Sequence, residues 1–193
     1  MTIQVENVCL KDGDRDILKN VNWEISSDDT WLLTGDHGSG KSALISIITG
    51  MLKPTSGRVR LLGDYKYDRV NAGVVFQEDR LIENLTAAEN VAVIRPETSP
   101  AVAAEELETF LDKESINIPV SALDPVKRRI TAIVRACSVP SDIILLDEPF
   151  AGMDDSTRKK AFSYIKEVAG HKGIVISAAD PEGLPPLRTF RLT

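Results

Sequence analysis

The sequence contains little cysteine and no excess of positive charge. Its two cysteines, Cys9 and Cys137, lack the close spacing of metal-ligand pairs, so we expect reduced thiols in a cytoplasmic protein. The 23 Lys and Arg residues are outnumbered by 29 Asp and Glu residues, which gives a formal net charge of −6. Because binding to nucleic acid requires clustered basic residues, this balance argues against nucleic acid as a main partner. A nucleotide stays possible, since its phosphates need only a local anion site.

The sequence also lacks a signal peptide at its start, and no apolar run approaches the roughly 18 residues that cross a bilayer. Any membrane role therefore has to pass through a partner. We expect a cytoplasmic protein that is at most peripheral at the inner face of the cell membrane. The 193 residues are enough for one substantial core, so we expect a single domain over residues 1–193.

A glycine-rich stretch from Gly35 to Ser42 has the spacing G-x-x-x-x-G-K-[ST] of a phosphate-binding loop. An apolar strand, Trp31 to Thr34, precedes it, and apolar residues at helical spacing follow it. Glycines let successive N–H groups converge there, and the start of the helix adds its own N–H groups and dipole. The alternative is a glycine-rich turn that binds nothing. The predicted nucleotide-binding residues are Gly35, Asp36, His37, Gly38, Ser39, Gly40, Lys41, Ser42 and Ala43.

Two side chains of this loop have predicted chemical roles. Lys41 can reach the β- and γ-phosphates as a point charge, and the Ser42 hydroxyl can ligate a magnesium ion that bridges them.

The rest of the chain alternates between strand and helix patterns, which favours an α/β fold. Polar and apolar residues alternate in the first 25 residues around a turn-like Lys11 to Asp14, which predicts an antiparallel start to the sheet. The other predicted strands are 58–62, 73–76, 143–146, 173–177 and 188–192.

A mostly helical segment is expected from about residue 78 to 140. Thr86 and Glu89 fit a capping box, Ser99 and Pro100 fit the start of a helix that continues to Leu111, and Asp124 fits the N-cap of a helix to residue 138. A further helix is expected from 155 to 168.

Two acids follow a continuous apolar run from Ile143 to Leu146, which is typical of a buried parallel strand. Ligands of open α/β sheets bind at the carboxyl ends of such strands, where these acids would lie. Asp147 is therefore predicted to hold the magnesium shell, and Glu148 to polarise an attacking water. The alternative is that both acids only cap the next segment.

Together these motifs resemble the nucleotide-binding domain of the ATP-binding cassette (ABC) family over essentially the whole chain. The resemblance rests on Gly35 to Ser42, Gln77, Ile143 to Pro149, and Phe150 to Asp154, in this order. It implies a P-loop NTPase fold with a mixed, mostly parallel sheet, an antiparallel β-subdomain and a short inserted helical subdomain. It also implies two such domains closing head to tail around two ATP molecules.

The resemblance assigns roles to two further residues. Gln77 matches the glutamine that joins the lobes, contacts magnesium and senses the transport subunit, although a solvent-facing strand end is the alternative. Asp154 matches an aspartate at the dimer interface, and its alternative is the N-cap of the next helix.

The chain departs from the family pattern at its signature segment, normally Leu-Ser-Gly-Gly-Gln, which is Leu123-Asp124-Pro125-Val126-Lys127 here. The family's serine and glycines give a γ-phosphate a hydroxyl and close backbone N–H groups. Asp124 instead offers a carboxylate, Pro125 has no N–H, and Val126 adds bulk. Lys127, Arg128 and Arg129 can offset the negative charge or form a solvated basic face. We expect a good helix start and a poor anion site.

Three further departures concern the nucleotide and the membrane partner. The family's histidine at the γ-phosphate falls in Ala178-Ala179-Asp180, and its adenine-stacking aromatic falls on Asp12. Trp31 is a possible substitute for that aromatic, but a tryptophan packed in the core is the favoured interpretation. About forty residues separate Gln77 from the signature position, so we expect a reduced groove for a transporter helix.

These patterns support two main hypotheses. The first is an ATP-binding subunit of an ABC-type transporter that binds Mg-ATP, dimerises with itself or with a second ABC ATPase, contacts an integral membrane permease, and hydrolyses ATP weakly alone. The second is a switch in which ATP occupancy, not turnover, controls a partner. A small-molecule kinase is a third candidate, which the family order of the motifs disfavours.

Overall fold

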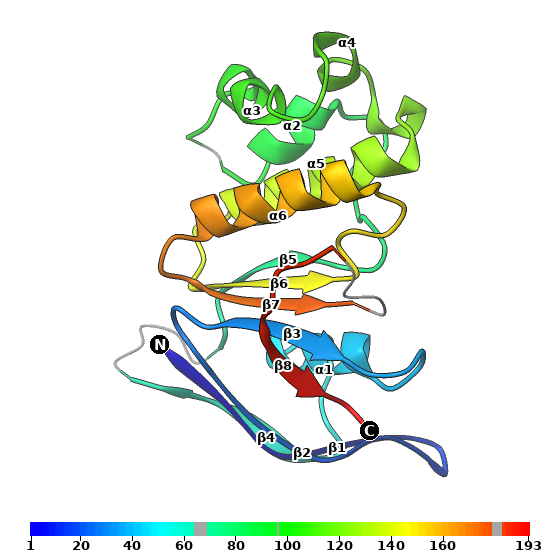
Figure 1. Cartoon of the computed structure of the whole chain (residues 1–193), viewed down its shortest axis with the longest axis vertical. Coiled ribbons are helices and arrows are strands. Elements are labelled where there is room, and N and C mark those ends of the chain that lie inside the picture. The colour runs from blue at the N-terminus through cyan, green and yellow to red at the C-terminus, as the bar shows by residue number, and fades with distance from the viewer. Residues whose placement is uncertain (64–68, 96, 179–182) are drawn as a thin grey trace.

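The computed structural model describes residues 1–63, 69–95, 97–178 and 183–193. Its strands form two separate sheets, one antiparallel and one parallel, stacked below a set of helices (Figure 1). None of the helices in the described ranges is both long and apolar enough to span a lipid bilayer.

The antiparallel sheet has the order β2-β1-β4, with a tight turn at Gly13 and Asp14 between its first two strands. The hairpin expected for the first 25 residues is therefore present, and it pairs with β4 instead of joining the parallel strands. The sheet consists of β1 (Thr2–Asp12), β2 (Arg15–Ser26) and β4 (Ser56–Leu62).

The parallel sheet has the order β5-β6-β7-β3-β8, and every described pairing in it is parallel. The α/β class predicted from the strand and helix patterns is confirmed. Strand β7 lies between β3 and β6, so the segments that follow β3 and β6 flank the carboxyl end of β7. The sheet consists of β3 (Thr30–Thr34), β5 (Ala72–Val75), β6 (Ile143–Asp147), β7 (Gly173–Ser177) and β8 (Arg188–Arg191).

Helices cover both faces of the parallel sheet. Helix α1 lies between it and the antiparallel sheet, whereas α5 and α6 cover the opposite face and carry α2, α3 and α4 above them (Figure 1). The helices are α1 (Lys41–Ile48), α2 (Ala87–Ala92), α3 (Pro100–Leu107), α4 (Lys113–Ile116), α5 (Pro125–Ser138) and α6 (Asp155–Ala169).

The predicted helix starts in this region are present. Thr86 and Glu89 form a complete capping box, and the Ser99 and Asp124 side chains accept hydrogen bonds from the third residue of their helices. The expected end at Leu111 is wrong, because α3 ends at Leu107 and Asp112 caps the separate short helix α4. Four residues are too few to give α4 a helical periodicity that the sequence could reveal.

Two hydrophobic clusters lie on the two sides of the parallel sheet, and β6 contributes to both. Ile144 and Leu146 pack in the cluster with the helices α2 to α6, whereas Ile143 and Leu145 pack with α1 and the antiparallel sheet. All four side chains are fully buried, as expected for a strand covered on both faces.

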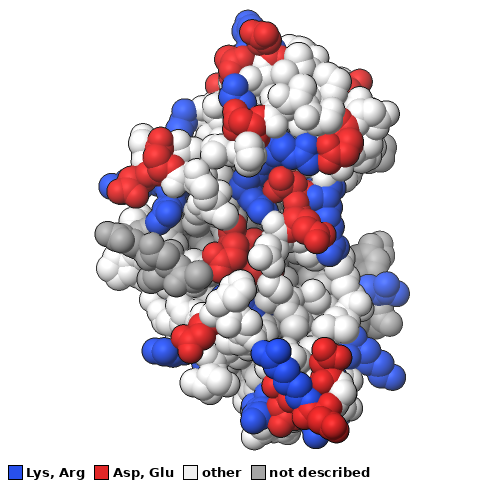
Figure 2. Space-filling view, turned by 90° about the vertical axis from the view of Figure 1, so that its right-hand side faces the viewer, with Lys and Arg blue, Asp and Glu red and all other residues white. Residues whose placement is uncertain are grey.

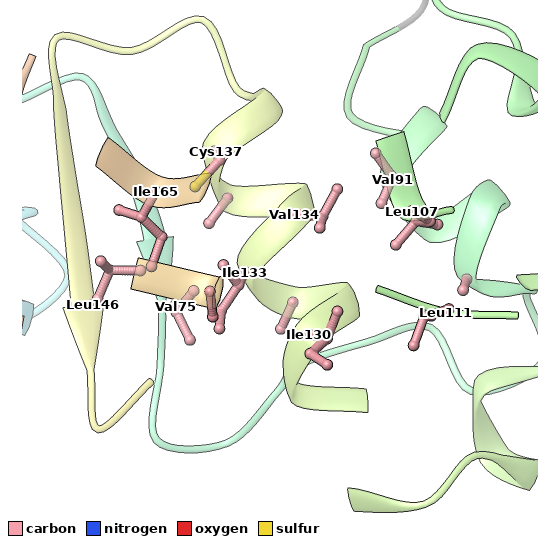
Figure 3. Packing of buried hydrophobic residues seen from close by; sticks show 14 of the residues in the cluster. Val75, Val91, Leu107, Leu111, Ile130, Ile133, Val134, Cys137, Leu146 and Ile165 are labelled. Atoms are coloured by element: carbon pink, nitrogen blue, oxygen red, sulfur yellow. The ribbon is translucent and has the colours of Figure 1, made fainter. Parts of the chain in front are cut away.

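Helix α5 is the centre of the larger cluster. Its Ile133 faces Val75 on β5, and its Val134 faces Val91 on α2 (Figure 3). This helix therefore joins the upper helices to the sheet, and Asp124 and Pro125 stand at its start.

Candidate nucleotide-binding site

The glycine-rich loop connects β3 to α1 through residues in unusual backbone conformations. Gly35, Gly38 and Gly40 all have positive φ, which other residues rarely adopt. A Cβ atom on Gly35 would lie 2.8 Å from the Leu192 carbonyl oxygen, and one on Gly40 would lie 2.7 Å from the Leu18 side chain. The loop therefore needs glycine at these positions both for its curvature and for its packing on β2 and on the residue that follows β8.

A cavity of about 320 Å³ opens over this loop. It brings the loop together with Gln77 after β5 and with Asp147 and Glu148 at the end of β6, which are distant in sequence. Gly35 and Asp36 lie at the base of the loop and contribute carbonyl oxygens to Lys41 instead of lining the cavity. The lining residues are His37, Gly38, Ser39, Gly40, Lys41, Ser42, Ala43, Gln77, Asp147 and Glu148.

Lys41 is largely buried, with 8% of its surface exposed. Its Nζ atom donates hydrogen bonds to the carbonyl oxygens of Gly35, at 2.9 Å, and Asp36, at 3.2 Å. These contacts fold the side chain back over the loop, so that the ammonium group lies beside the cavity.

Asp147 is fixed by a serine that the sequence analysis missed. Asp147 is 3% exposed, and its Oδ1 atom accepts a 2.5 Å hydrogen bond from Oγ of Ser177 on the adjacent strand β7. Ser177 is the last residue of β7, so its position at the carboxyl edge could have identified it as a candidate.

Glu148 follows β6 directly and has a left-handed backbone, with φ of +48°. Its backbone N–H donates to both Oγ and the carbonyl oxygen of Ser177, at 3.0 and 3.2 Å. These bonds hold the turn after the strand, and the Glu148 side chain lines the cavity.

The residues around the cavity fit a phosphate group with a hard divalent cation. The Ser39 hydroxyl oxygen is buried, and no partner for it is found in the described ranges, so it could bind a ligand oxygen. Ser42, Gln77 and Asp147 supply hydroxyl, amide and carboxylate oxygens, the donor types that Mg²⁺ prefers. The donor set therefore suits Mg²⁺ and a triphosphate.

The segment aligned with the family signature in the sequence analysis begins α5 and is capped from within the chain. The Asp124 carboxylate accepts a 2.9 Å hydrogen bond from the backbone N–H of Lys127, so it caps its own helix. Pro125 occupies the first helical position, as expected.

Of the two alternatives for residues 127–129, the solvated basic face is not found, because all three side chains bind other parts of the chain. Lys127 donates to the Ser115 hydroxyl at 2.8 Å, and Arg128 binds the Glu83 carboxylate through two nitrogens. Arg129 donates to the carbonyl oxygens of Phe76 and Gln77. These partners of Arg128 and Arg129 lie 45 to 53 positions away in the sequence, and the partner of Lys127 lies in the short helix α4. The charge pattern alone could not predict these contacts.

The remaining predictions concern single residues. Asp154 caps α6, accepting from the Thr157 backbone N–H at 2.7 Å. Trp31 is half-buried and packs edge-on against Trp23 and beneath the Arg188 guanidinium, so it lies at the border of the core. Asp12 is exposed at the end of β1. Ala178 is buried just after β7, whereas residues 179 and 180 of the expected histidine position lie outside the described residues.

The model of the ABC transporter family matches residues 18–151. The chain belongs to the ABC transporter family. This match includes the glycine-rich loop, Gln77 and both acids of the cavity.

Individual ABC proteins agree with this assignment. The chain is 31% identical over 185 residues to the probable sulfate/thiosulfate import ATP-binding protein CysA of Chlorella vulgaris, covering 87% of this chain and 75% of that protein. It is 32% identical to the corresponding CysA protein of a Synechocystis strain, again over 87% of this chain, but it spans only 50% of that relative's length.

A solved ABC structure has the same fold. It is the dimeric ATP-binding cassette MJ0796 in a post-hydrolysis state bound to ADP and Pi, with a TM-score of 0.82 and 30% identity. The match covers 94% of this chain and 89% of that cassette.

Proposed function

We propose that this chain is the cytoplasmic ATP-binding subunit of an ABC-type transporter, which binds Mg-ATP and hydrolyses it to drive a membrane permease. The observation that carries the proposal is the convergence of Lys41, Ser42, Gln77, Asp147 and Glu148 around one cavity. The two CysA relatives are named as import ATP-binding proteins, which supports import as the direction. We treat residues 1–193 as one ABC-type ATP-binding domain, with a helical subdomain at about 78–140.

The proposed roles follow from the position of each side chain. Backbone N–H groups of the loop and the start of α1 bind the phosphates, and Lys41 leaves the Gly35 and Asp36 carbonyls to reach the β- and γ-phosphates. Ser42, Gln77 and Asp147 would hold Mg²⁺, with Ser177 fixing the orientation of Asp147. When bound, Mg²⁺ stabilises charge that develops on the phosphate oxygens.

Glu148 is proposed to accept a proton from the attacking water at its carboxylate. The hydrogen bonds from its backbone N–H to Ser177 keep this carboxylate at the edge of the cavity. A carboxylate that orients and deprotonates water contributes about 10² to 10⁴ in rate.

Turnover by the isolated chain is proposed to be weak. Two copies closing head to tail would present Asp124 and Pro125 to each other's γ-phosphate, where a carboxylate repels and a proline has no N–H to donate. A second cassette with an intact signature would complete this chain's site, which favours a heterodimer as the efficient form. Brisk, cooperative turnover of the isolated chain that disappears in Asp124→Ala would contradict this.

Titration calorimetry with Mg-ATP tests the binding step. We expect saturable heat that Lys41→Ala abolishes and that Lys53→Ala, an exposed lysine beyond α1, leaves unchanged. Absence of heat in the unmodified chain, or heat that survives Lys41→Ala, would overturn the nucleotide assignment.

The degenerate signature also favours a second candidate, a switch that responds to ATP occupancy without turnover. The two candidates differ at Glu148. If Glu148→Gln lengthens the lifetime of bound ATP, the carboxylate acts in hydrolysis, whereas an unchanged lifetime favours the switch.

A further inference from the structure

Arginines of α5 hold the backbone that follows β5. Arg129 donates to the carbonyl oxygens of Phe76, at 2.6 Å, and Gln77, at 2.5 Å. Arg135, less than two turns further along α5, donates to the carbonyl oxygens of Asp79 and Arg80, each at 2.8 Å. Four of the five carbonyls from residue 76 to 80 therefore bind guanidinium groups of one helix.

Two carboxylates, Asp79 and Glu83, offset part of the positive charge of these arginines. The Arg129 side chain is only 11% exposed, and its Nε lies 3.2 Å from Oδ1 of Asp79, which is itself 16% exposed. Arg128 is 3.7 Å from the same carboxylate and binds Glu83. Figure 2 views the edge of the molecule where the parallel strands end, and it shows basic and acidic side chains side by side between the helices and the sheet. Arg129 is thus held by one ion pair, to Asp79, and by its two bonds to backbone carbonyls.

The guanidinium of Arg129 is suited to fixing a backbone. Its planar, forked donors bind two neighbouring carbonyls at once, which a lysine ammonium on a flexible stem does less well. The residue held in this way is Gln77, which lines the cavity with Lys41, Asp147 and Glu148.

We propose that Arg129 is a positioning residue that sets the location of Gln77, and thereby the Mg²⁺ dependence of nucleotide binding. This rests on the proposed function, because Gln77 acts on Mg²⁺ only if the cavity binds Mg-ATP. Arg135 holds the chain two and three residues further on, so it contributes mainly to stability. The helix that starts at the altered signature therefore acts on its own subunit's cavity through Arg129.

Calorimetry of ATP binding across a series of Mg²⁺ concentrations tests this, in the Glu148→Gln background so that ATP is not consumed. Arg129→Gln should raise the Mg²⁺ concentration for half-maximal binding by about tenfold, the usual effect of losing a residue that orients a metal ligand. Arg135→Gln is the matched control, and it should lower the melting temperature while changing the Mg²⁺ requirement less than about twofold.

A double-mutant cycle with Gln77→Ala shows whether both residues act through one interaction. Arg129→Gln combined with Gln77→Ala should require no more Mg²⁺ than Gln77→Ala alone. Effects that multiply, or an unchanged Mg²⁺ requirement in Arg129→Gln, would overturn the proposal.

If Arg129→Gln does not fold, Arg129→Lys replaces it, because lysine keeps the positive charge beside Asp79. A Mg²⁺ requirement of Arg129→Lys equal to that of the Glu148→Gln parent would then overturn the proposal. Lys41→Ala distinguishes failure of this proposal from failure of the proposed function. If ATP still produces binding heat in Lys41→Ala, the nucleotide site itself is refuted.

Discussion

Ser177 and Asp147 end adjacent parallel strands and share a 2.5 Å hydrogen bond from hydroxyl to carboxylate. Both side chains are almost completely buried. The same hydroxyl accepts the Glu148 backbone N–H, so one serine orients the proposed metal ligand and the turn that carries the proposed base. Ser177, which does not line the cavity, thus contacts both the Asp147 carboxylate and the backbone of Glu148.

Ser177→Ala should weaken Mg²⁺-dependent ATP binding by about tenfold, because it frees the Asp147 carboxylate to rotate. It should also reduce the free energy of unfolding by about 1–3 kcal/mol, since a buried oxygen loses its donor. Calorimetry and urea unfolding measure the two effects. Ser115→Ala is the control, because Ser115 makes a similar bond to Asp112 at 2.9 Å in the helical region. Equal effects of both substitutions on ATP binding would contradict the proposed role of Ser177.

Glu148→Gln should lower ATP turnover by at least about 100-fold while keeping ATP binding, because the amide keeps the shape of the side chain but cannot accept the proton. Phosphate release under single-turnover conditions, with calorimetry of ATP binding, measures both. Glu167→Gln, on the exposed part of α6, should leave turnover unchanged. Turnover in Glu148→Gln equal to that of the unmodified chain would show that another group activates the water.

Asp124→Ala should lower the free energy of unfolding by about 1 kcal/mol, because α5 loses the side chain that caps it. Asp124→Ser should stay within a few tenths of a kcal/mol of the unmodified chain, because serine caps as well as aspartate. Urea unfolding measures both. An equal loss in the two variants would indicate that the aspartate stabilises the fold by its charge and not as a cap.

The two cysteines should differ sharply in reactivity. Burial raises the pKa of the Cys137 thiol to about 12, whereas a hydrogen bond from the Asn20 backbone N–H lowers the pKa of Cys9. At pH 8 more of Cys9 is therefore the reactive thiolate, and almost none of Cys137 is. Iodoacetamide followed by mass spectrometry should modify Cys9 first and Cys137 only after unfolding. Cys9→Ser should remain unmodified in the native state, and rapid labelling of this variant would contradict the buried environment.

Features set by a few neighbouring residues could be predicted from the sequence. The glycine-rich loop, the capping residues Thr86 and Asp124, and the strand before Asp147 all depend on local geometry, and the structure has them. The convergence of the loop with Asp147 also follows from sequence, because parallel strands end at one edge.

Features that depend on distant contacts could not be predicted. Arg129 contacts a carbonyl 52 residues away, and nothing in a run of three basic residues distinguishes this from a solvated face. The sequence could place Ser177 at the carboxyl edge of the sheet, but its bond to Asp147 depends on β7 lying next to β6, which the sequence did not show. Helix α4 is too short to have a periodicity, and it forms where Asp112 caps it and Ile116 is buried.

The alternating side chains of β6 have a consequence for how the molecule melts. Ile143 and Leu145 belong to one hydrophobic cluster, and Ile144 and Leu146 belong to the other. Neither cluster can therefore unfold while β6 stays in the sheet. Heating should therefore give a single cooperative transition. Truncating any of these four side chains should shift that transition as a whole, without splitting it in two.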